Sequence, residues 1–545
     1  MSSYSLEGRG RIQSKLIVML LLSSILIGYL VARDLLGTLG IPTVSMLIAA
    51  TGGILLVLIG LNNIDILLGC LVFSFPFTTI AINVPALSYG ILAADILSIT
   101  LVLLLLGERI VGKQVHKSVT MNRASWGLIL FIVVVLGSMV MSAWVPVSEY
   151  GGEVRWVKSI KQFLKLLLIV APYFVVLSRG GTMQLFEKYI RWLVISGFVV
   201  SLYAMYQIVG TRFHLDLPLL SFGRNITMGE GARELIVSFY GLPRVHSFLS
   251  EPDNFGSYLL MGLPLLIAAR MKGVELSGRF FDVFSLLLTF FVFVFTFSRS
   301  PYFGLLVSVL ALLWVLRSYS VHSLWTNRGI VVGLVLICFI AATIAPSADS
   351  GGRSWMEILV GRMLSAFDMR HDSSTWERWT MLGTSINMLR AFPVLGVGFG
   401  NFGFHYPLFE PDWGWTIFDV SGRFASAQSM FVRILAETGI LGTLTYFFFT
   451  FYTVKLAIRS ATVLKKAKAK LVARRLLVFQ AGLLAAFVGI SVSLFLSSAE
   501  LGTHYYFFVA AMIVLGSKLS EDLVNNVPAS SAQQCGSIPP KGDRP

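Results

Sequence analysis

The sequence predicts an all-α, polytopic integral membrane protein with about fourteen transmembrane helices. Three observations lead to this prediction. Of the 545 residues, 56% are hydrophobic and only 13% are charged, unlike the composition of a soluble domain. Apolar runs long enough to cross a hydrocarbon core of about 30 Å recur along the chain. More of the 43 lysines and arginines lie in one alternate set of connections than in the other, as the positive-inside rule requires.

The first apolar run follows Arg9, Arg11 and Lys15 in the manner of a signal peptide. No small-residue cleavage site follows this run, so we expect a retained first helix. The predicted spans lie near residues 16–33, 43–61, 64–82, 90–106, 125–144, 163–177, 189–209, 254–269, 281–297, 302–316, 329–345, 436–454, 476–497 and 502–517.

The positions of lysine and arginine predict the orientation. The most basic connection, Lys455–Arg475, belongs inside, which places both termini in the cytoplasm. A connection as long as that before the twelfth span usually carries function. The expected regions are helices 1 to 11 in residues 1–345 with an outer loop at 210–253, a large periplasmic loop at 346–435, helices 12 to 14 in 436–518, and a disordered cytoplasmic tail at 519–545.

Composition argues against two other classes of protein. The net charge of +15 is not arranged as a basic helix or an aromatic-interleaved stripe, so we expect no nucleic-acid partner. The three cysteines are Cys70 and Cys338, each inside an apolar run, and Cys535 in the polar tail. This spacing predicts neither a disulfide nor a metal site.

Arginine dominates the predicted outer segments, where lysine is scarce. A guanidinium is a planar donor that can bind two oxygens of a phosphate or carboxylate at once, so the bias predicts an anion site on the outer face. The outer lysines are Lys158, Lys161 and Lys165, which follow Arg155 and Trp156 at helical spacing. This group predicts an interfacial helix on anionic lipid headgroups.

Four motifs occur in order between these spans. They are Arg244–Phe255, which contains a Pro-Asp-Asn helix start, then Ser298-Arg299-Ser300, then Arg378 followed by the glycine-rich turn Pro393–Gly400, and finally Glu437–Gly442. Over about residues 190–455 the chain thereby resembles the O-antigen ligase and O-antigen polymerase superfamily. Each motif is a weak signal alone, and the four in this order, between spans of the right orientation, make a stronger one.

The resemblance implies transfer of a glycan from undecaprenyl pyrophosphate to an acceptor hydroxyl on the periplasmic face of the bacterial inner membrane, without metal, nucleotide sugar or cofactor. Such a reaction needs cations for the leaving pyrophosphate and a base for the acceptor hydroxyl. A flippase and a chain-length regulator are further possible partners, beside the lipid bilayer. The candidate catalytic residues are Arg378, Arg299, Arg244, His405 and Glu437, and the candidate substrate-binding residues are Arg224, Asp95, Asp253, Asn254 and Gln428.

One position departs from the family pattern. Ligases of this family typically carry a histidine about nine residues before the glutamate, where this chain has Gln428. Because an amide is no base, the sequence favours a polymerase of lipid-linked repeats, with an O-antigen ligase as the alternative and a flippase or transporter as the second alternative. A base would then come from His405, Glu410, Asp412 or Asp419.

Several of these residues also have purely structural readings. Ser250, Pro252 and Asp253 have the spacing of a capping box at the start of a span. Asp95 lies inside an apolar run, where a carboxylate is costly unless it is paired, and Arg299 is a plausible partner. Arg299 itself can be an interfacial arginine that reaches the headgroups. The Pro393–Gly400 turn is expected mainly to shape the backbone.

Overall fold

The protein divides into two compact units, Met1–Cys70 and Leu71–Pro545, and the packing described below is that within the second unit. The structure is a computed structural model, and it describes residues 64–78, 81–84, 89–110, 121–141, 149–150, 153–212, 238–239, 242–249, 251–316, 361, 373–412, 427, 429–467, 470–497 and 503–525.

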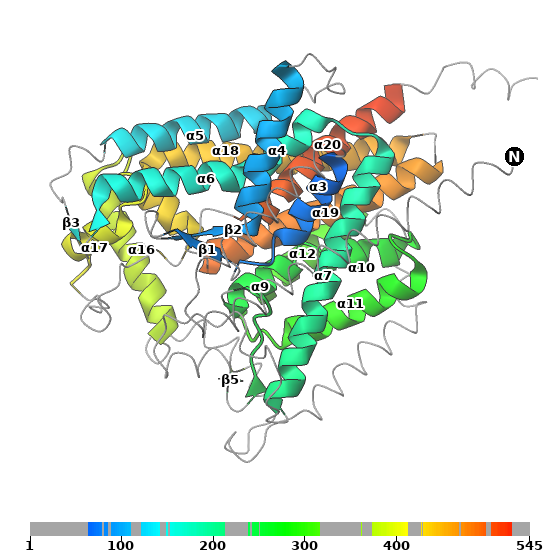
Figure 1. The fold of residues 1–545 in the computed structure, drawn as a ribbon, viewed down its shortest axis with the longest axis horizontal. Helices are drawn as coiled ribbons and strands as arrows, with labels where there is room; N and C mark the ends of the chain where they lie inside the picture. Colours follow the sequence, from blue (N-terminus) through cyan, green and yellow to red (C-terminus); the bar gives the residue numbers. More distant parts are fainter. Residues whose placement is uncertain are drawn as a thin grey trace, which may run out of the picture. The chain divides into compact units, whose positions relative to one another are not determined.

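Helices make up most of the described chain (Figure 1). Three short antiparallel pairs, β1–β2, β3–β4 and β5–β6, join neighbouring helices. The helices are α3 (Ile64–Ser74), α4 (Ala93–Ile110), α5 (Arg123–Met141), α6 (Arg155–Arg179), α7 (Met183–Arg212), α9 (Pro252–Leu259), α10 (Leu263–Lys272), α11 (Arg279–Val294), α12 (Arg299–Leu316), α16 (Ser373–Ala391), α17 (Phe402–Phe409), α18 (Met430–Lys466), α19 (Lys470–Ser497) and α20 (His504–Asn525). The strands are β1 (Ala81–Val84), β2 (Tyr89–Leu92), β3 (Glu149–Tyr150), β4 (Glu153–Val154), β5 (Ser238–Phe239) and β6 (Leu242–Pro243).

The membrane class predicted from the sequence is confirmed. Within the described residues, six helices are long and apolar enough to cross a bilayer, and they lie in α5, α6, α7, α12, α18 and α19. The protein is therefore an all-α polytopic membrane protein. The predicted spans at 16–33, 43–61 and 329–345 lie outside the described residues.

Two predicted spans are interrupted, and a proline lies near each interruption. The span predicted at 64–82 is wrong in its second half, because α3 ends at Ser74 and a turn around Pro76 leads into β1. The span predicted at 254–269 is two helices, α9 and α10, separated at Leu260–Gly262. Pro264 has no N–H to donate to the preceding turn, which favours the start of a new helix at this position.

Helix α18 is longer than the predicted span at 436–454. It begins at Met430, where the Ser429 hydroxyl caps the Val432 N–H, and it runs to Lys466. Since α19 starts at Lys470, most of the basic stretch Lys455–Arg475 is helical. The predicted large loop likewise contains two helices, α16 and α17.

The basic residues at the start of α6 do not face the lipid as predicted. Helix α6 is one continuous helix, and Arg155 and Lys161 are buried at 6% and 9% exposure. Trp156 and Ile160 are exposed instead, and the Lys158 ammonium lies 5.3 Å from the centre of the Phe404 ring. The apolar face of this helix therefore points outward, as expected inside a bilayer.

Small residues bring α12 and α19 into close contact. A side-chain carbon added at Gly304 would lie 2.6 Å from the Gly489 carbonyl oxygen, and one added at Gly489 would lie 2.7 Å from the Gly304 oxygen. The Ser308 hydroxyl donates to the Ala485 carbonyl across the same interface at 2.6 Å. This is the small-residue packing typical of membrane helices, and it holds the first turn of α12, which carries Arg299, in place.

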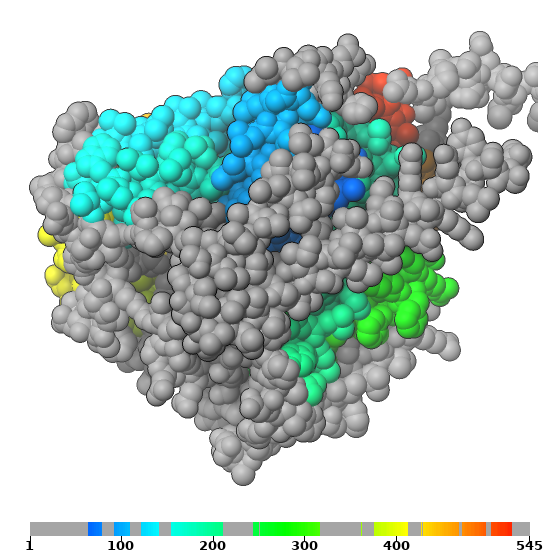
Figure 2. All heavy atoms as spheres, viewed as in Figure 1, coloured from blue at the N-terminus to red at the C-terminus, as the bar shows by residue number. Residues whose placement is uncertain are grey.

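An apolar outer surface surrounds this core. Helices α5 and α6 form a continuous face beside α4 (Figure 2). Exposed side chains on this face include Leu130, Val133 and Leu136 of α5 and Leu103 of α4. An exposed apolar surface of this extent is costly in water, so these helices face lipid.

Candidate functional site

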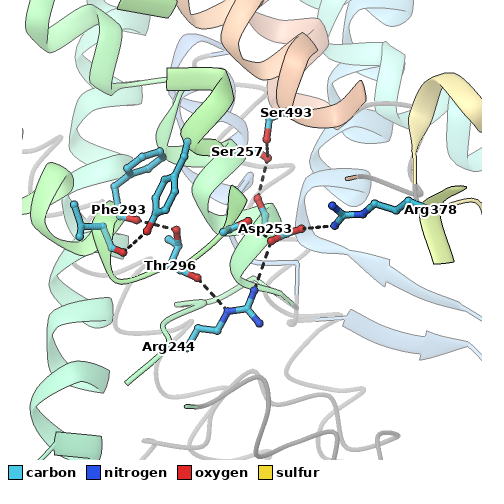
Figure 3. A network of polar contacts seen from close by, with 10 residues as sticks. Arg244, Asp253, Ser257, Phe293, Thr296, Arg378 and Ser493 are labelled. Atoms are coloured by element: carbon cyan, nitrogen blue, oxygen red, sulfur yellow. Dashed lines mark hydrogen bonds and ion pairs between the residues drawn. The ribbon is translucent and has the colours of Figure 1, made fainter. Parts of the chain in front are cut away.

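Three arginines predicted from separate motifs come together near one carboxylate. Arg244 Nη2 lies 3.7 Å from Asp253 Oδ1, and Arg378 Nη2 lies 3.7 Å from Asp253 Oδ2 (Figure 3). The Ser298 hydroxyl donates to the same carboxylate, which places the neighbouring Arg299 beside the group. We call Arg244, Asp253, Arg299 and Arg378 the arginine cluster. Three segments that are distant in sequence thus build one site.

The backbone around Arg244 holds its side chain in place. The Arg244 Nε–H donates to the Thr296 carbonyl at 3.1 Å, and the Val245 N–H donates to the Phe295 carbonyl at 3.1 Å. Burial lowers the pKa of Arg244, and the nearby Asp253 carboxylate opposes this shift. The guanidinium therefore stays charged in a largely dry setting.

Two residues next to the cluster adopt a strained backbone. Among the described residues, Ser247 with φ 54° and Phe297 with φ 45° are the non-glycine residues with positive φ. Ser247 is fixed by hydrogen bonds to the Gln207 side chain at 2.9 Å and the Val200 carbonyl at 2.8 Å. Such strain gathers at sites where position matters, here on either side of the arginines.

Asp253 does not form the predicted capping box. The N-cap of α9 is Glu251, without a side-chain hydrogen bond, and Pro252 occupies the first turn. The Asp253 carboxylate turns instead toward the two guanidinium groups, while its carbonyl accepts from the Ser257 hydroxyl at 2.8 Å. Ser257 in turn contacts Ser493 of α19 at 2.7 Å, which ties α9 to α19.

A cavity of about 370 Å³ opens beside the arginine cluster. We call it the main cavity. Arg299 and Arg378 both line it, and the Arg299 Nη1–H donates to the Thr375 hydroxyl at 3.1 Å. The remaining wall is mostly apolar and comes from α12, α16, α18 and α19. Its side chains are Phe303, Trp379, Met381, Leu382, Phe431, Val432, Phe495 and Leu496, with Ser300 and Ser429.

The Pro393–Gly400 turn and the Glu437–Gly442 motif pack together through backbone hydrogen bonds. We call this contact the joint. Helix α18 breaks at Gly439, with φ 63°, and the Pro393–Gly400 turn docks into the break. The Val397 and Gly398 N–H groups donate to the carbonyls of Ala436 and Glu437 at 2.9 and 3.2 Å, and the Ile440 N–H donates to the Pro393 carbonyl at 2.9 Å. The structure thus supports the structural reading of this turn.

Glu437 belongs to this joint and is absent from the lining of the main cavity. Its carboxylate accepts from the Phe402 N–H at 3.2 Å and pairs with Arg433 at 3.1 Å. Arg433 also donates to Gln162 of α6 at 3.1 Å. These contacts make Glu437 a residue that fixes α17 and α6 against α18.

His405 of α17 is fully buried, and neither ring nitrogen has a hydrogen-bond partner within the described structure. Burial, with a contribution from Arg155, lowers the pKa of His405 to about 4. The imidazole is therefore neutral near pH 7. It is not among the residues that line the main cavity.

Asp95 pairs with a residue other than the predicted Arg299. Asp95 Oδ1 lies 2.9 Å from His504 Nε2, and the Leu92 N–H donates to Asp95 Oδ2 at 2.9 Å. Both side chains are buried, so this pair joins α4 to α20.

We expect His504→Ala to destabilise the protein by about 3 kcal/mol, because it leaves a buried carboxyl without its imidazole partner. Thermal melting of the purified protein in detergent measures this. Asp95→Asn should cost less, and adding it to His504→Ala should cost less than the sum of the two. Additive losses would show that the two side chains do not interact.

The remaining candidates differ in what the structure says of them. Asn254 follows Asp253 in the first turn of α9 and is half-buried. Arg224 and Gln428 lie outside the described residues. Sequence reasoning missed Thr375, Phe431 and Phe495. Thr375 lies one helical turn before Arg378, which was a usable signal, whereas the two phenylalanines are indistinguishable from other apolar residues in membrane helices.

Comparison with known proteins agrees with these motifs. Residues 284–447 match the O-Antigen ligase family, a stretch that includes Arg299, Arg378, the Pro393–Gly400 turn and Glu437. No curated protein matches the chain. Arg244 and Asp253 precede the matched stretch, and only the fold brings them to it. The match supports the resemblance of this chain to the superfamily of O-antigen ligases and O-antigen polymerases.

Proposed function

We propose that the protein is a membrane glycosyltransferase of the O-antigen ligase type, which moves a glycan from a polyprenyl pyrophosphate to an acceptor hydroxyl. The observation that carries this proposal is the main cavity, which is lined by two arginines and otherwise mostly by apolar side chains. An anion attached to a hydrocarbon chain matches both surfaces.

The arginine cluster supplies the chemistry of the leaving group. The acceptor oxygen attacks the anomeric carbon of the donor sugar while the bond from that carbon to the pyrophosphate oxygen breaks. The electron pair of that bond goes to the pyrophosphate, and the hydroxyl proton goes to solvent or to the released diphosphate. Arg299 and Arg378 stabilise the developing negative charge, so that no metal ion is required in this scheme.

Asp253 serves in this proposal as an internal counter-ion. Its two carboxylate oxygens lie 3.7 Å from Arg244 and from Arg378, as phosphate oxygens would. A pyrophosphate that enters the main cavity competes with this carboxylate for the Arg378 guanidinium, which contacts Asp253 and also lines the cavity. Asp253 thus keeps the arginines in place between reaction cycles, when no anion neutralises them.

The choice of acceptor differs from the sequence-based expectation. Gln428 favoured a polymerase, whereas the family match favours the alternative, a ligase that hands a glycan to a lipid or protein. We therefore propose the ligase reaction. In this proposal the site faces the periplasm, the chain lies in the inner membrane with both termini in the cytoplasm, and a flippase and chain-length regulator act before it.

Deletion of the gene in its host distinguishes the two reactions. Without a ligase, full-length glycan should accumulate on the polyprenyl carrier, because polymerisation continues while transfer stops. Without a polymerase, single repeats should accumulate or be transferred. Gel analysis of extracted lipid-linked glycans reads out the difference, and the deletion strain complemented with the intact gene is the control. Accumulation of single repeats would overturn the ligase assignment.

A further inference from the structure

A second, smaller cavity of about 60 Å³ adjoins the main cavity. Phe431 of α18 and Phe495 of α19 line both cavities, so these two side chains form the shared wall. The other residues that line the small cavity come from α18, α19 and α20, and they are Met430, Ile434, Thr443, Tyr446, Phe447, Thr450, Ser491 and Tyr506.

The small cavity has an apolar interior although five hydroxyl groups surround it. Thr443 and Thr450 donate to the carbonyls of Gly439 and Tyr446 at 2.8 and 3.1 Å, one turn back in α18. Ser491 donates to the Phe487 carbonyl at 2.7 Å in the same way. Because these hydroxyls are satisfied within their own helices, little polar surface is left to hold water. The cavity therefore suits a hydrocarbon.

Aromatic rings stand where the two cavities meet. The rings of Phe431 and Phe495 stack with centroids 4.8 Å apart, and Phe447 lies 5.8 Å from Phe431. Phe495 and Phe447 are 44% and 48% exposed. Since α18 and α19 are long enough to span the membrane, these exposed rings open toward lipid. A hydrocarbon chain can thus pass from the main cavity along this wall to the bilayer.

We propose that the small cavity is a binding subsite for the first isoprene units of the donor's prenyl chain. This inference rests on the proposed function, because the pyrophosphate of the same molecule lies at Arg299 and Arg378. Two observations select this occupant over a phospholipid acyl chain. The small cavity shares a wall with the main cavity, which holds Arg299 and Arg378, and its volume of about 60 Å³ accommodates a short hydrocarbon stretch next to that anion site rather than a long chain. The rest of the prenyl chain leaves between α18 and α19.

Binding of short analogues to the purified full-length protein tests the subsite. The probes are inorganic pyrophosphate, which has no hydrocarbon, and geranyl pyrophosphate, which carries two isoprene units. Wild-type protein should bind geranyl pyrophosphate at least about tenfold more tightly than inorganic pyrophosphate, because the subsite buries the first units. Isothermal titration at a fixed detergent concentration measures both affinities.

Two variants change the subsite in opposite ways. Thr443→Phe fills the small cavity, and Phe447→Ala removes part of its wall without changing the lining of the main cavity. Each should lose most of the gain from the geranyl chain while inorganic pyrophosphate still binds as in wild type, which also shows that the variant is folded. Phe284→Ala is the matched control, because Phe284 lies on α11, is exposed to a similar extent at 46% and lines neither cavity.

Two results would overturn the inference, and they are distinguishable. If both variants keep the full geranyl gain, the prenyl chain lies elsewhere, as expected if a phospholipid acyl chain fills the small cavity. The proposed function would then still stand. If wild-type protein binds neither pyrophosphate probe, the assignment of the main cavity to a pyrophosphate donor fails, and the subsite fails with it.

Discussion

Arg378→Lys should be nearly as inactive as Arg378→Ala, with a loss of about 10²-fold or more in the rate of glycan transfer. Arg378 lines the main cavity and contacts Asp253 at 3.7 Å. A guanidinium is a rigid fork that can hold two oxygens of a pyrophosphate, whereas an ammonium is a point charge on a flexible stem. If Arg378 only balanced charge, lysine would serve as well.

The measurement is product yield from purified variants in proteoliposomes, with matched protein amounts and melting temperatures. Arg390→Lys is the control, because Arg390 lies on the same helix, α16, but is exposed in its last turn and outside the main cavity. It should retain wild-type activity. Near wild-type activity in Arg378→Lys would refute the bidentate role and leave Arg244 and Arg299 as the groups that bind the leaving pyrophosphate.

Gly396→Ala should cost about 3 kcal/mol or more in stability and should also abolish transfer. Gly396 has φ 69°, a conformation that alanine adopts only with strain. Its added carbon would lie 2.5 Å from the Glu437 carbonyl carbon and 2.6 Å from the Thr438 nitrogen. These are backbone atoms, which cannot rotate away, so the turn would have to leave the break in α18.

Activity should fall with stability here, because the first turns of α18 carry Phe431 and Val432 into the main cavity. Thermal melting in detergent, combined with the transfer assay, measures both effects. Gly197→Ala is the control, since Gly197 lies inside α7 and a side-chain carbon there would meet nothing within 4 Å. It should be neutral or slightly stabilising. If Gly396→Ala melts at the same temperature as Gly197→Ala, the packing of the Pro393–Gly400 turn into the break of α18 does not contribute to stability.

The membrane class follows from the sequence, because it depends on composition and on the length of apolar runs. A helix spans a bilayer only if nearly every residue along about 20 positions is apolar. Such a run can be recognised in the sequence without knowing the structure. The break at Leu260–Gly262 was not predicted, because a proline alone does not decide where a helix ends: Pro264 lies at the start of α10, whereas Pro172 lies inside the continuous helix α6. The excess of arginine over lysine in the predicted outer segments marked Arg244, Arg299 and Arg378 as candidate anion-binding residues before their positions were known.

Which residues meet was decided by the tertiary structure. Asp253 had the spacing of a helix cap, yet it faces two arginines that lie on other segments. Asp95 pairs with His504 rather than with Arg299. Glu437 lies in the joint, where its carboxylate accepts from the Phe402 N–H. A buried charged side chain pairs with the polar side chain that helix packing places within contact distance. That distance is set by close packing between helices, such as the backbone of Gly304 against that of Gly489, and local sequence does not specify which helices pack together.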